Sequence, residues 1–362
     1  MNLNNAKEIV EMNQVMEQLS SQPADRKYFI DNLRSFTVFI LFPYHICLIY
    51  NNWGEHWYIH ETALLIPSIF KITCDFWMMP LLFAIAGISS RYALKKRSVG
   101  EYAKERVGKL LIPFIFGLLL VIPFQSFIAG IYFNNEVNYL NFFTKITELN
   151  GYDGTFTPGN LWFIPFLFVI SMASLPFMIW YKNKGKGTLG DKIPLILIVL
   201  MGLLPCIGSN IKIGGKSPTE DLAYFILAFF FLSNDKLLER LDKYRFVLFG
   251  SYALYAAFTT FVLHGEFYEM ASWLGILTIL GMGRHYLDFT GKITRYLSKS
   301  CFGVYIFHQT WIVVTAFYIL KISSSPAVQI PFILSAAVIL TILTYEICRR
   351  IPATRWMFGL KK

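Results

Sequence analysis

Long apolar runs separated by short polar segments dominate this sequence. A helix needs about 20 predominantly apolar residues to cross a bilayer, so each long run predicts a membrane span. Taken together, the runs predict an all-α fold, a polytopic transmembrane helical bundle of about ten spans. The predicted spans are 29–50, 65–90, 110–133, 160–181, 193–210, 220–233, 246–263, 270–283, 300–320 and 328–348.

Composition and charge placement support the same interpretation. The chain is 55% hydrophobic and 15% charged, which excludes an ordinary soluble domain. Its net charge of +10 would suggest a nucleic-acid partner in a soluble protein. Here, however, 27 of the 33 Lys and Arg residues fall in segments on the same side as the N-terminus. The positive-inside rule therefore predicts that both termini are cytoplasmic. We expect the protein in the inner (cytoplasmic) membrane, where its partner is the lipid bilayer and not nucleic acid.

The chain divides into two parts of unequal length. Residues 1–25 are polar, which predicts a loosely ordered cytoplasmic leader. A weak amphipathic helix on the cytoplasmic side is the alternative. They contain no apolar run followed by a cleavage site, so no signal peptide is predicted. Residues 26–362 predict one integral membrane domain.

The first apolar run, 28–50, carries three ionisable side chains, Asp31, Arg34 and His45. Such a group inside a span costs about 2.5–3.5 kcal/mol or more, so its default interpretation is functional. Arg34 and His45 are eleven residues apart, which places them on one helix face about 16 Å apart along the axis. If both serve one ligand, that ligand must be long and thin.

Structural roles for the same residues remain open at this point. Asp31 and Arg34 are three residues apart and form a local pair in one alternative. Arg34 lies about two turns into the helix, from where it can also reach the membrane surface. His45 is equally compatible with a hydrogen bond to a carbonyl of a neighbouring helix.

Further polar or aromatic residues in or beside the spans are candidates too. Asp75 could either orient a histidine through its carboxylate or pair with a cation. His308 is either a packed polar residue or a functional one, in which case it is predicted, like Asp75 and Trp162, to bind substrate. Trp162 is either an interfacial belt residue or a platform for a sugar ring. Arg106 and Lys109 suit either a phosphate-bearing ligand or anionic lipid head groups.

No metal site is expected. The five cysteines are scattered without metal-binding spacing and predict apolar packing residues. His56 and His60 have an i, i+4 spacing but no third clear ligand, which favours interfacial belt residues.

Several short motifs resemble those of the membrane-bound acyltransferase 3 family, from about residue 27 to the C-terminus. The R-x10-H of Arg34 and His45, within FIDNLRSF…PYHICLIY, resembles its first-helix signature. FAIAGIS resembles its F-x-x-S-G segment with Ala86 in place of Ser, and ERVGKLLIP its R-x2-R-x3-P segment with Lys109 in place of the second Arg. NLWFIPFL, VYIFHQT and YEICRRIP resemble its L-W-F-L, Y-x-x-H and final-helix segments.

This resemblance implies acyl transfer across the membrane, from cytoplasmic acyl-CoA to a carbohydrate hydroxyl at the outer face. The acyl group is acetyl or succinyl, and a succinyl group would require a cation near the reacting end, for which Lys71 is the nearest candidate. The residue roles implied are His45 as general base, Arg34, Arg106 and Lys109 as CoA ligands, Asp31 as the residue that orients Arg34, and Trp162 with loop 134–159 facing the acceptor.

A second function class is a proton-coupled transporter that uses Arg34, His45, Asp75 and His308 as a relay. A third is a membrane module without catalytic activity. Stabilisation of the purified protein by acyl-CoA, but not by sugars or ions, distinguishes the enzyme from the transporter.

Overall fold

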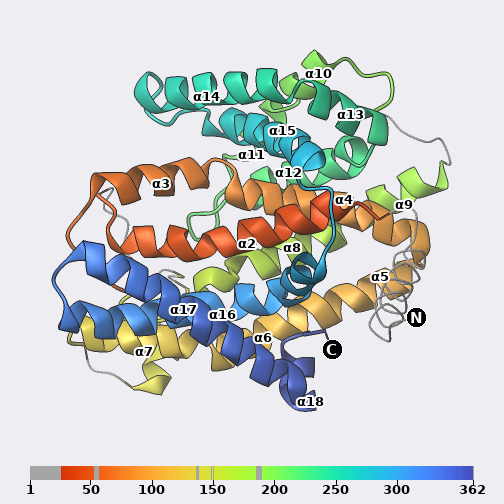
Figure 1. Cartoon of the computed structure of the whole chain (residues 1–362). Coiled ribbons are helices and arrows are strands. Elements are labelled where there is room, and N and C mark those ends of the chain that lie inside the picture. The colour runs from red at the N-terminus through yellow and green to blue at the C-terminus, as the bar shows by residue number, and fades with distance from the viewer. Residues whose placement is uncertain are drawn as a thin grey trace, which may run out of the picture.

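The structure is a computed structural model that describes residues 26–52, 57–135, 138–147, 149, 151–184 and 190–361. Within these residues the regular secondary structure is helical, and the one β-type pairing is an isolated bridge between Ile213 and Lys216. This arrangement confirms the all-α prediction (Figure 1). The predicted leader, 1–25, and His56 lie outside the described residues.

The helices follow one another along the chain. In order they are α2 (Tyr28–Ile49), α3 (Leu65–Asp75), α4 (Met78–Lys96), α5 (Val99–Arg106), η1 (Val107–Leu111), α6 (Ile112–Leu120), α7 (Ile122–Tyr132), η2 (Tyr139–Phe143), η3 (Gly159–Trp162), α8 (Phe163–Ala173), α9 (Leu175–Asn183), α10 (Leu195–Leu200), α11 (Leu203–Gly208), α12 (Pro218–Leu227), η4 (Ala228–Leu232), α13 (Asp235–Lys243), α14 (Arg245–Phe261), α15 (Tyr268–Tyr286), α16 (Lys292–Ile322), α17 (Pro326–Arg350) and α18 (Pro352–Met357).

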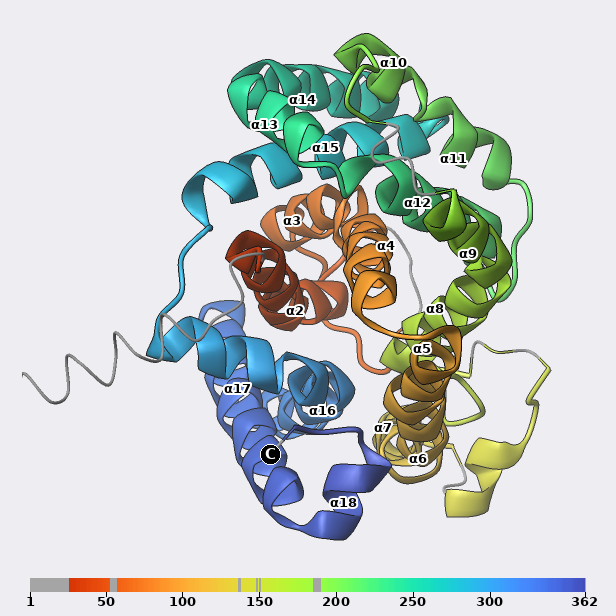
Figure 2. The same cartoon turned by 90° about the vertical axis from the view of Figure 1, so that its right-hand side faces the viewer.

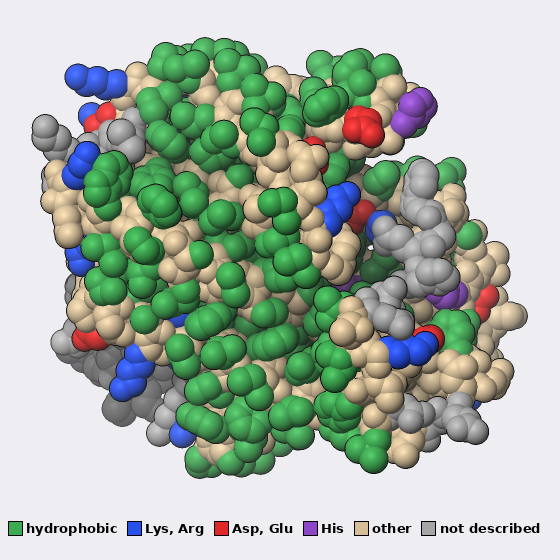
Figure 3. Space-filling view, turned by 180° about the vertical axis from the view of Figure 1, so that it is seen from behind, with side chains coloured by type: hydrophobic (Ala, Val, Ile, Leu, Met, Phe, Trp, Pro, Cys, Tyr) green, Lys and Arg blue, Asp and Glu red, His purple; other side chains and the backbone are tan. Residues whose placement is uncertain are grey.

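Among the described residues, five helical stretches are long and apolar enough to cross a membrane, or six if the bent pair α8 and α9 forms one span. Hydrophobic side chains cover much of the surface in Figure 3, as expected for helices that face lipid. The chain is therefore a multi-pass membrane protein, while the count of ten spans and the cytoplasmic termini stay predictions.

Helix α2 lies inside the bundle and contacts α3, α4, α15, α16 and α17 (Figures 1 and 2). It continues through Pro43 as one helix. The next predicted span, 65–90, is instead two helices, because α3 ends at Asp75 and α4 begins at Met78. Pro80 accounts for this break, since its ring clashes with the carbonyl of Phe76 and removes one helical hydrogen bond.

The helical stretch from α5 to α7 carries two of the predicted cations. It begins with a capping box, in which the Ser98 hydroxyl accepts from the Glu101 N–H at 3.3 Å and the Glu101 carboxylate accepts from the Ser98 N–H at 2.8 Å. Arg106 ends α5, and Lys109 lies in the π-helical turn η1 that follows. Such turns shift the helical register and are frequent at functional sites.

The C-terminal segment folds back onto this turn. Gly359, directly after α18, has a φ of +59°, a conformation that favours glycine. A Cβ at this position would lie 3.0 Å from the Pro113 ring and 3.4 Å from the Gly108 carbonyl oxygen. The close approach places the last described residues, Leu360 and Lys361, beside α6 and η1.

The tightest helix contact involves Gly87 of α4. A Cβ there would lie 2.2 Å from the backbone oxygen of Phe225 on α12, which is far inside van der Waals contact. The same helix carries Ser89 and Ser90, so this contact fixes the position of both hydroxyl groups.

We expect Gly87→Ala to destabilise the purified protein by about 1–3 kcal/mol, because α4 and α12 must separate to admit the methyl group. Thermal unfolding in detergent, followed by the loss of monodisperse protein, measures the effect. Gly250→Ala is the matched control, since no heavy atom lies within 4 Å of that Cβ position in α14. Equal melting temperatures for the two variants would contradict the prediction.

Candidate active site

Arg34 lies at one end of a cavity of about 310 Å³ that we call the arginine cavity. α2, α4, α5, η1, α8, α16 and the C-terminal segment line it. Six of its lining residues are cations and one is a carboxylate, Glu105, so the cavity is strongly basic. The cations are Arg34, Arg97, Arg106, Lys109, Lys299 and Lys361.

Two helices hold the Arg34 guanidinium in place. It donates to the Ser89 hydroxyl of α4 at 2.7 Å and to the Asp31 carboxylate of its own helix at 3.3 Å. Asp31 also pairs with Arg26 at 2.7 Å. The local pair of Asp31 and Arg34 predicted from sequence is therefore present. Asp31, however, is shared with Arg26, and Arg34 also lines the arginine cavity.

The other predicted cations lie in the same cavity. Arg106 donates to the Ser90 hydroxyl at 2.9 Å, and its guanidinium lies over the ring of Tyr102 at 4.7 Å. Lys109 forms an ion pair with Glu105, which also pairs with Arg97 at 2.8 Å. The structure thus brings together the three cations that the sequence analysis assigned to a CoA ligand.

Sequence reasoning did not find the cation supplied by the C-terminal segment. Partial burial and the nearby charges of Lys109 and Arg34 lower the pKa of Lys361. The like charges crowd one another, so a bound polyanion would relieve their repulsion. Lys299, from the start of α16, was missed as well.

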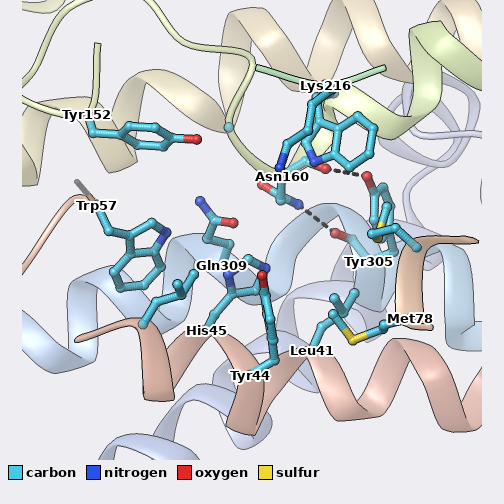
Figure 4. Close-up of a pocket in the computed structure, with 14 residues that line it drawn as sticks. Leu41, Tyr44, His45, Trp57, Met78, Tyr152, Asn160, Lys216, Tyr305 and Gln309 are labelled. Atoms are coloured by element: carbon cyan, nitrogen blue, oxygen red, sulfur yellow. Dashed lines mark hydrogen bonds between the residues drawn. The ribbon is translucent and has the colours of Figure 1, made fainter. Parts of the chain in front are cut away.

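Eleven residues further along α2, His45 lines a second cavity, of about 120 Å³, that we call the histidine cavity (Figure 4). Val38 lines the arginine cavity and Leu41 lines the histidine cavity. One face of α2 therefore passes along both cavities, as its spacing predicted. The His45 ring stacks on Trp57 at 5.8 Å with only 10° between the planes.

Tyr305 lines both cavities and stands between them. Its hydroxyl donates to the backbone oxygen of Asn160. The Asn160 side chain donates in turn to the backbone oxygen of Tyr305 at 2.8 Å, as Figure 4 shows. This pair of hydrogen bonds ties α16 to η3 where the two cavities approach each other.

Trp162 lines the histidine cavity, as expected of a residue that faces an acceptor. The ammonium group of Lys216 lies 5.2 Å from the centre of its ring (Figure 4). Lys216 is the one lining residue with a permanent charge among those described, and it forms no ion pair with a described residue. It was missed because the tight turn at Gly214 and Gly215 brings it to the cavity from a distant part of the chain.

Asp75 and Lys71 show one of the two alternatives left open for Asp75, that of a partner for a cation. They form an ion pair with each other at 2.8 Å, and neither lines the histidine cavity. Asp75 also accepts from the Tyr44 hydroxyl at 2.8 Å, and Tyr44 does line it. Lys71, expected as the nearest cation to the reacting end, is paired with this carboxylate, while Lys216 lies in the cavity.

His308, assigned to substrate binding in the sequence analysis, does not line either cavity. It is fully buried, and its ring centre lies 5.1 Å from that of His45. Among the described residues, no group of three or more His, Cys, Asp or Glu side chains is arranged to hold a metal ion.

Comparisons with known proteins identify the family of this chain. The family model for the acyltransferase domain matches residues 27–346. The chain is 23% identical to the "Glucans biosynthesis protein C" of Salmonella typhi and of Salmonella typhimurium strain LT2, and 22% identical to that of Salmonella paratyphi A. Each of these similarities covers 95% of this chain and 97% of the relative. No solved structure matches.

The family match covers most of the chain, including the whole lining of the histidine cavity and all of the arginine cavity's lining except Gly359, Leu360 and Lys361. This multi-pass membrane protein therefore belongs to the acyltransferase 3 family, and it is an acyltransferase.

Proposed function

We propose that this acyltransferase moves an acyl group from cytoplasmic acyl-CoA to a carbohydrate hydroxyl on the outer side of the inner membrane. The observation that carries the proposal is the shared face of α2, with Arg34 in one cavity and His45 in the other. The span of about 16 Å between them suits the thin pantetheine arm of CoA.

The arginine cavity suits the nucleotide end of the donor. CoA carries several phosphate groups, and arginine guanidinium groups bind phosphate oxygens through paired N–H donors. Arg34 and Arg106 are each anchored by a serine hydroxyl of α4, which leaves other N–H groups available to phosphate. Lys109 and Lys361 add charge without such fixed geometry.

In the proposed reaction, His45 acts as general base. Its Nε2 accepts the proton of the acceptor hydroxyl while that oxygen attacks the thioester carbonyl. The carbon–sulfur bond breaks, the new ester forms, and the proton passes to the departing thiolate to give free CoA. Trp57 stacks on the His45 ring and holds it at the wall of the cavity.

The acceptor is proposed to be a glucan or a related envelope glycan. Similarity to proteins named for glucan biosynthesis supports this class of acceptor. So do the aromatic rings of Trp57, Tyr152 and Trp162 in the histidine cavity, because sugar rings pack on aromatic faces.

Lys216 favours succinyl over acetyl as the transferred group. A succinyl thioester ends in a carboxylate, and Lys216 places an ammonium group that has no ion-pair partner among the described residues in the cavity where the thioester would react. An acetyl group offers this ammonium group no counter-charge. Family membership favours the enzyme over a proton-coupled transporter.

We expect His45→Ala to lower the transfer rate at least about 100-fold, as for the loss of a general base. Mass spectrometry of the acyl substituents on envelope glycans, with and without the variant, measures transfer in cells. Insertion into the membrane and stabilisation by acyl-CoA should be unchanged. Near-normal transfer by a correctly inserted variant would remove His45 from the reaction.

We expect Arg34→Lys to raise the KM for acyl-CoA about 10-fold with a smaller effect on kcat. Lysine keeps the charge but cannot contact Ser89, Asp31 and a phosphate group together. Initial rates over a range of donor concentrations measure the effect. Unchanged donor kinetics would show that this guanidinium does not bind the donor.

We expect Lys216→Gln to lower the preference for succinyl-CoA over acetyl-CoA, as the ratio of kcat/KM, by about 10-fold. Lys212→Gln is the matched control, because Lys212 lies on the same connection but does not line the cavity. Competition between the two donors in one assay gives the ratio directly. A ratio equal to that of the control would leave Lys216 without a role in donor choice.

A further inference from the structure

Two ring nitrogens in this region are buried without a hydrogen-bond partner among the described residues. They are Nδ1 of His45 and Nε2 of His308. The two rings are neighbours, with centres 5.1 Å apart and planes tilted by 39°. Buried polar atoms are nearly always paired, so two adjacent unpaired nitrogens call for an explanation.

The other nitrogen of His308 determines where its proton lies. Nδ1 is 2.9 Å from the backbone oxygen of Tyr305 and 3.2 Å from that of Val304. Carbonyl oxygens only accept hydrogen bonds, so Nδ1 carries the proton. In the neutral imidazole, Nε2 of His308 is therefore a bare acceptor.

Aromatic side chains pack against both rings. Trp57 stacks on His45, and Tyr44 meets the same ring edge to face at 5.1 Å. Phe42 meets the His308 ring edge to face at 5.6 Å. His308 is fully buried and lines neither cavity, so it is not placed to touch an acceptor sugar.

We infer that His308 is a positioning residue for His45. Its bare Nε2 accepts a hydrogen bond from Nδ1–H of His45, which leaves Nε2 of His45 unprotonated and available to the histidine cavity. No hydrogen bond joins the two rings in the described geometry. The separation of their centres leaves room for an N–H···N bond of about 3 Å after rotation of the His45 ring.

This inference rests on the proposed role of His45 as general base. It assigns to His308 the orienting role that the sequence analysis considered for Asp75, whose carboxylate contacts Tyr44 and Lys71. The pairing selects the one neutral tautomer of His45 that can accept a proton from the cavity side. Without this pairing, His45 would spend part of its time in the other neutral tautomer, in which the unprotonated nitrogen is the buried Nδ1.

Two substitutions separate this role from simple packing. The amide of glutamine reaches the place of Nε2 of histidine, whereas the shorter amide of asparagine reaches the place of Nδ1. His308→Gln should keep an acceptor for His45 and retain kcat within about threefold. His308→Asn should keep the bonds to the backbone carbonyls but lower kcat by about 10-fold or more, with both KM values unchanged.

Purified variants with acyl-CoA and envelope glucan give these constants, and stabilisation by acyl-CoA verifies that each variant is folded. Equal kcat values for the two folded variants, whether high or low, would overturn the inference. Unimpaired transfer by His45→Ala would instead overturn the proposed function.

A spectroscopic measurement on the unaltered protein provides a test that does not depend on folding of a variant. Solid-state NMR of protein labelled with ¹⁵N in the histidine rings reports which nitrogen of His45 carries the proton. Protonation at Nδ1 is expected. A neutral His45 ring protonated at Nε2 would overturn the inference.

Discussion

The structure depends on hydrogen-bond and ion-pair partners for the Arg34 guanidinium group within an apolar helix bundle. An arginine in a span costs about 2.5–3.5 kcal/mol or more, and partners in the protein reduce that cost. Ser89 of α4 and Asp31 of α2 are those partners for Arg34. α4 must therefore lie close to α2, and Gly87 allows α4 to pack against α12 at the same level. The cation that would bind the donor thus also constrains the arrangement of three helices.

The two cavities lie along one face of α2 and are separate spaces that share Tyr305 in their linings. Tyr305 and Asn160 form two hydrogen bonds where the cavities approach each other. In the proposed reaction this separation matters, because an acyltransferase that works across a membrane must pass a thin acyl arm without passing ions. Any such arm has to move past the Tyr305 side chain, which lines both cavities.

Much of the site could be predicted because it follows from the period of a single helix. Arg34 and His45 share a face in any straight α-helix, and Arg106 and Lys109 lie close together for the same local reason. Lys216 and Lys361 could not be predicted, since tertiary folding brings them to the cavities from distant parts of the chain. The interruption of the predicted second span does have a local cause, Pro80, which a reading by hydropathy alone overlooks.

The crowding of charge around the arginine cavity bears on the two ligands that the sequence left open for Arg106 and Lys109. Six cations face a single carboxylate among the described lining residues, and one of those cations, Lys361, is held there by the glycine turn at Gly359. A lipid head group with one phosphate would offset only part of this repulsion. A ligand with several phosphates compensates more of it within one cavity, because each added phosphate meets a separate cation at short range. The arrangement therefore favours a polyphosphate ligand such as CoA over a membrane lipid.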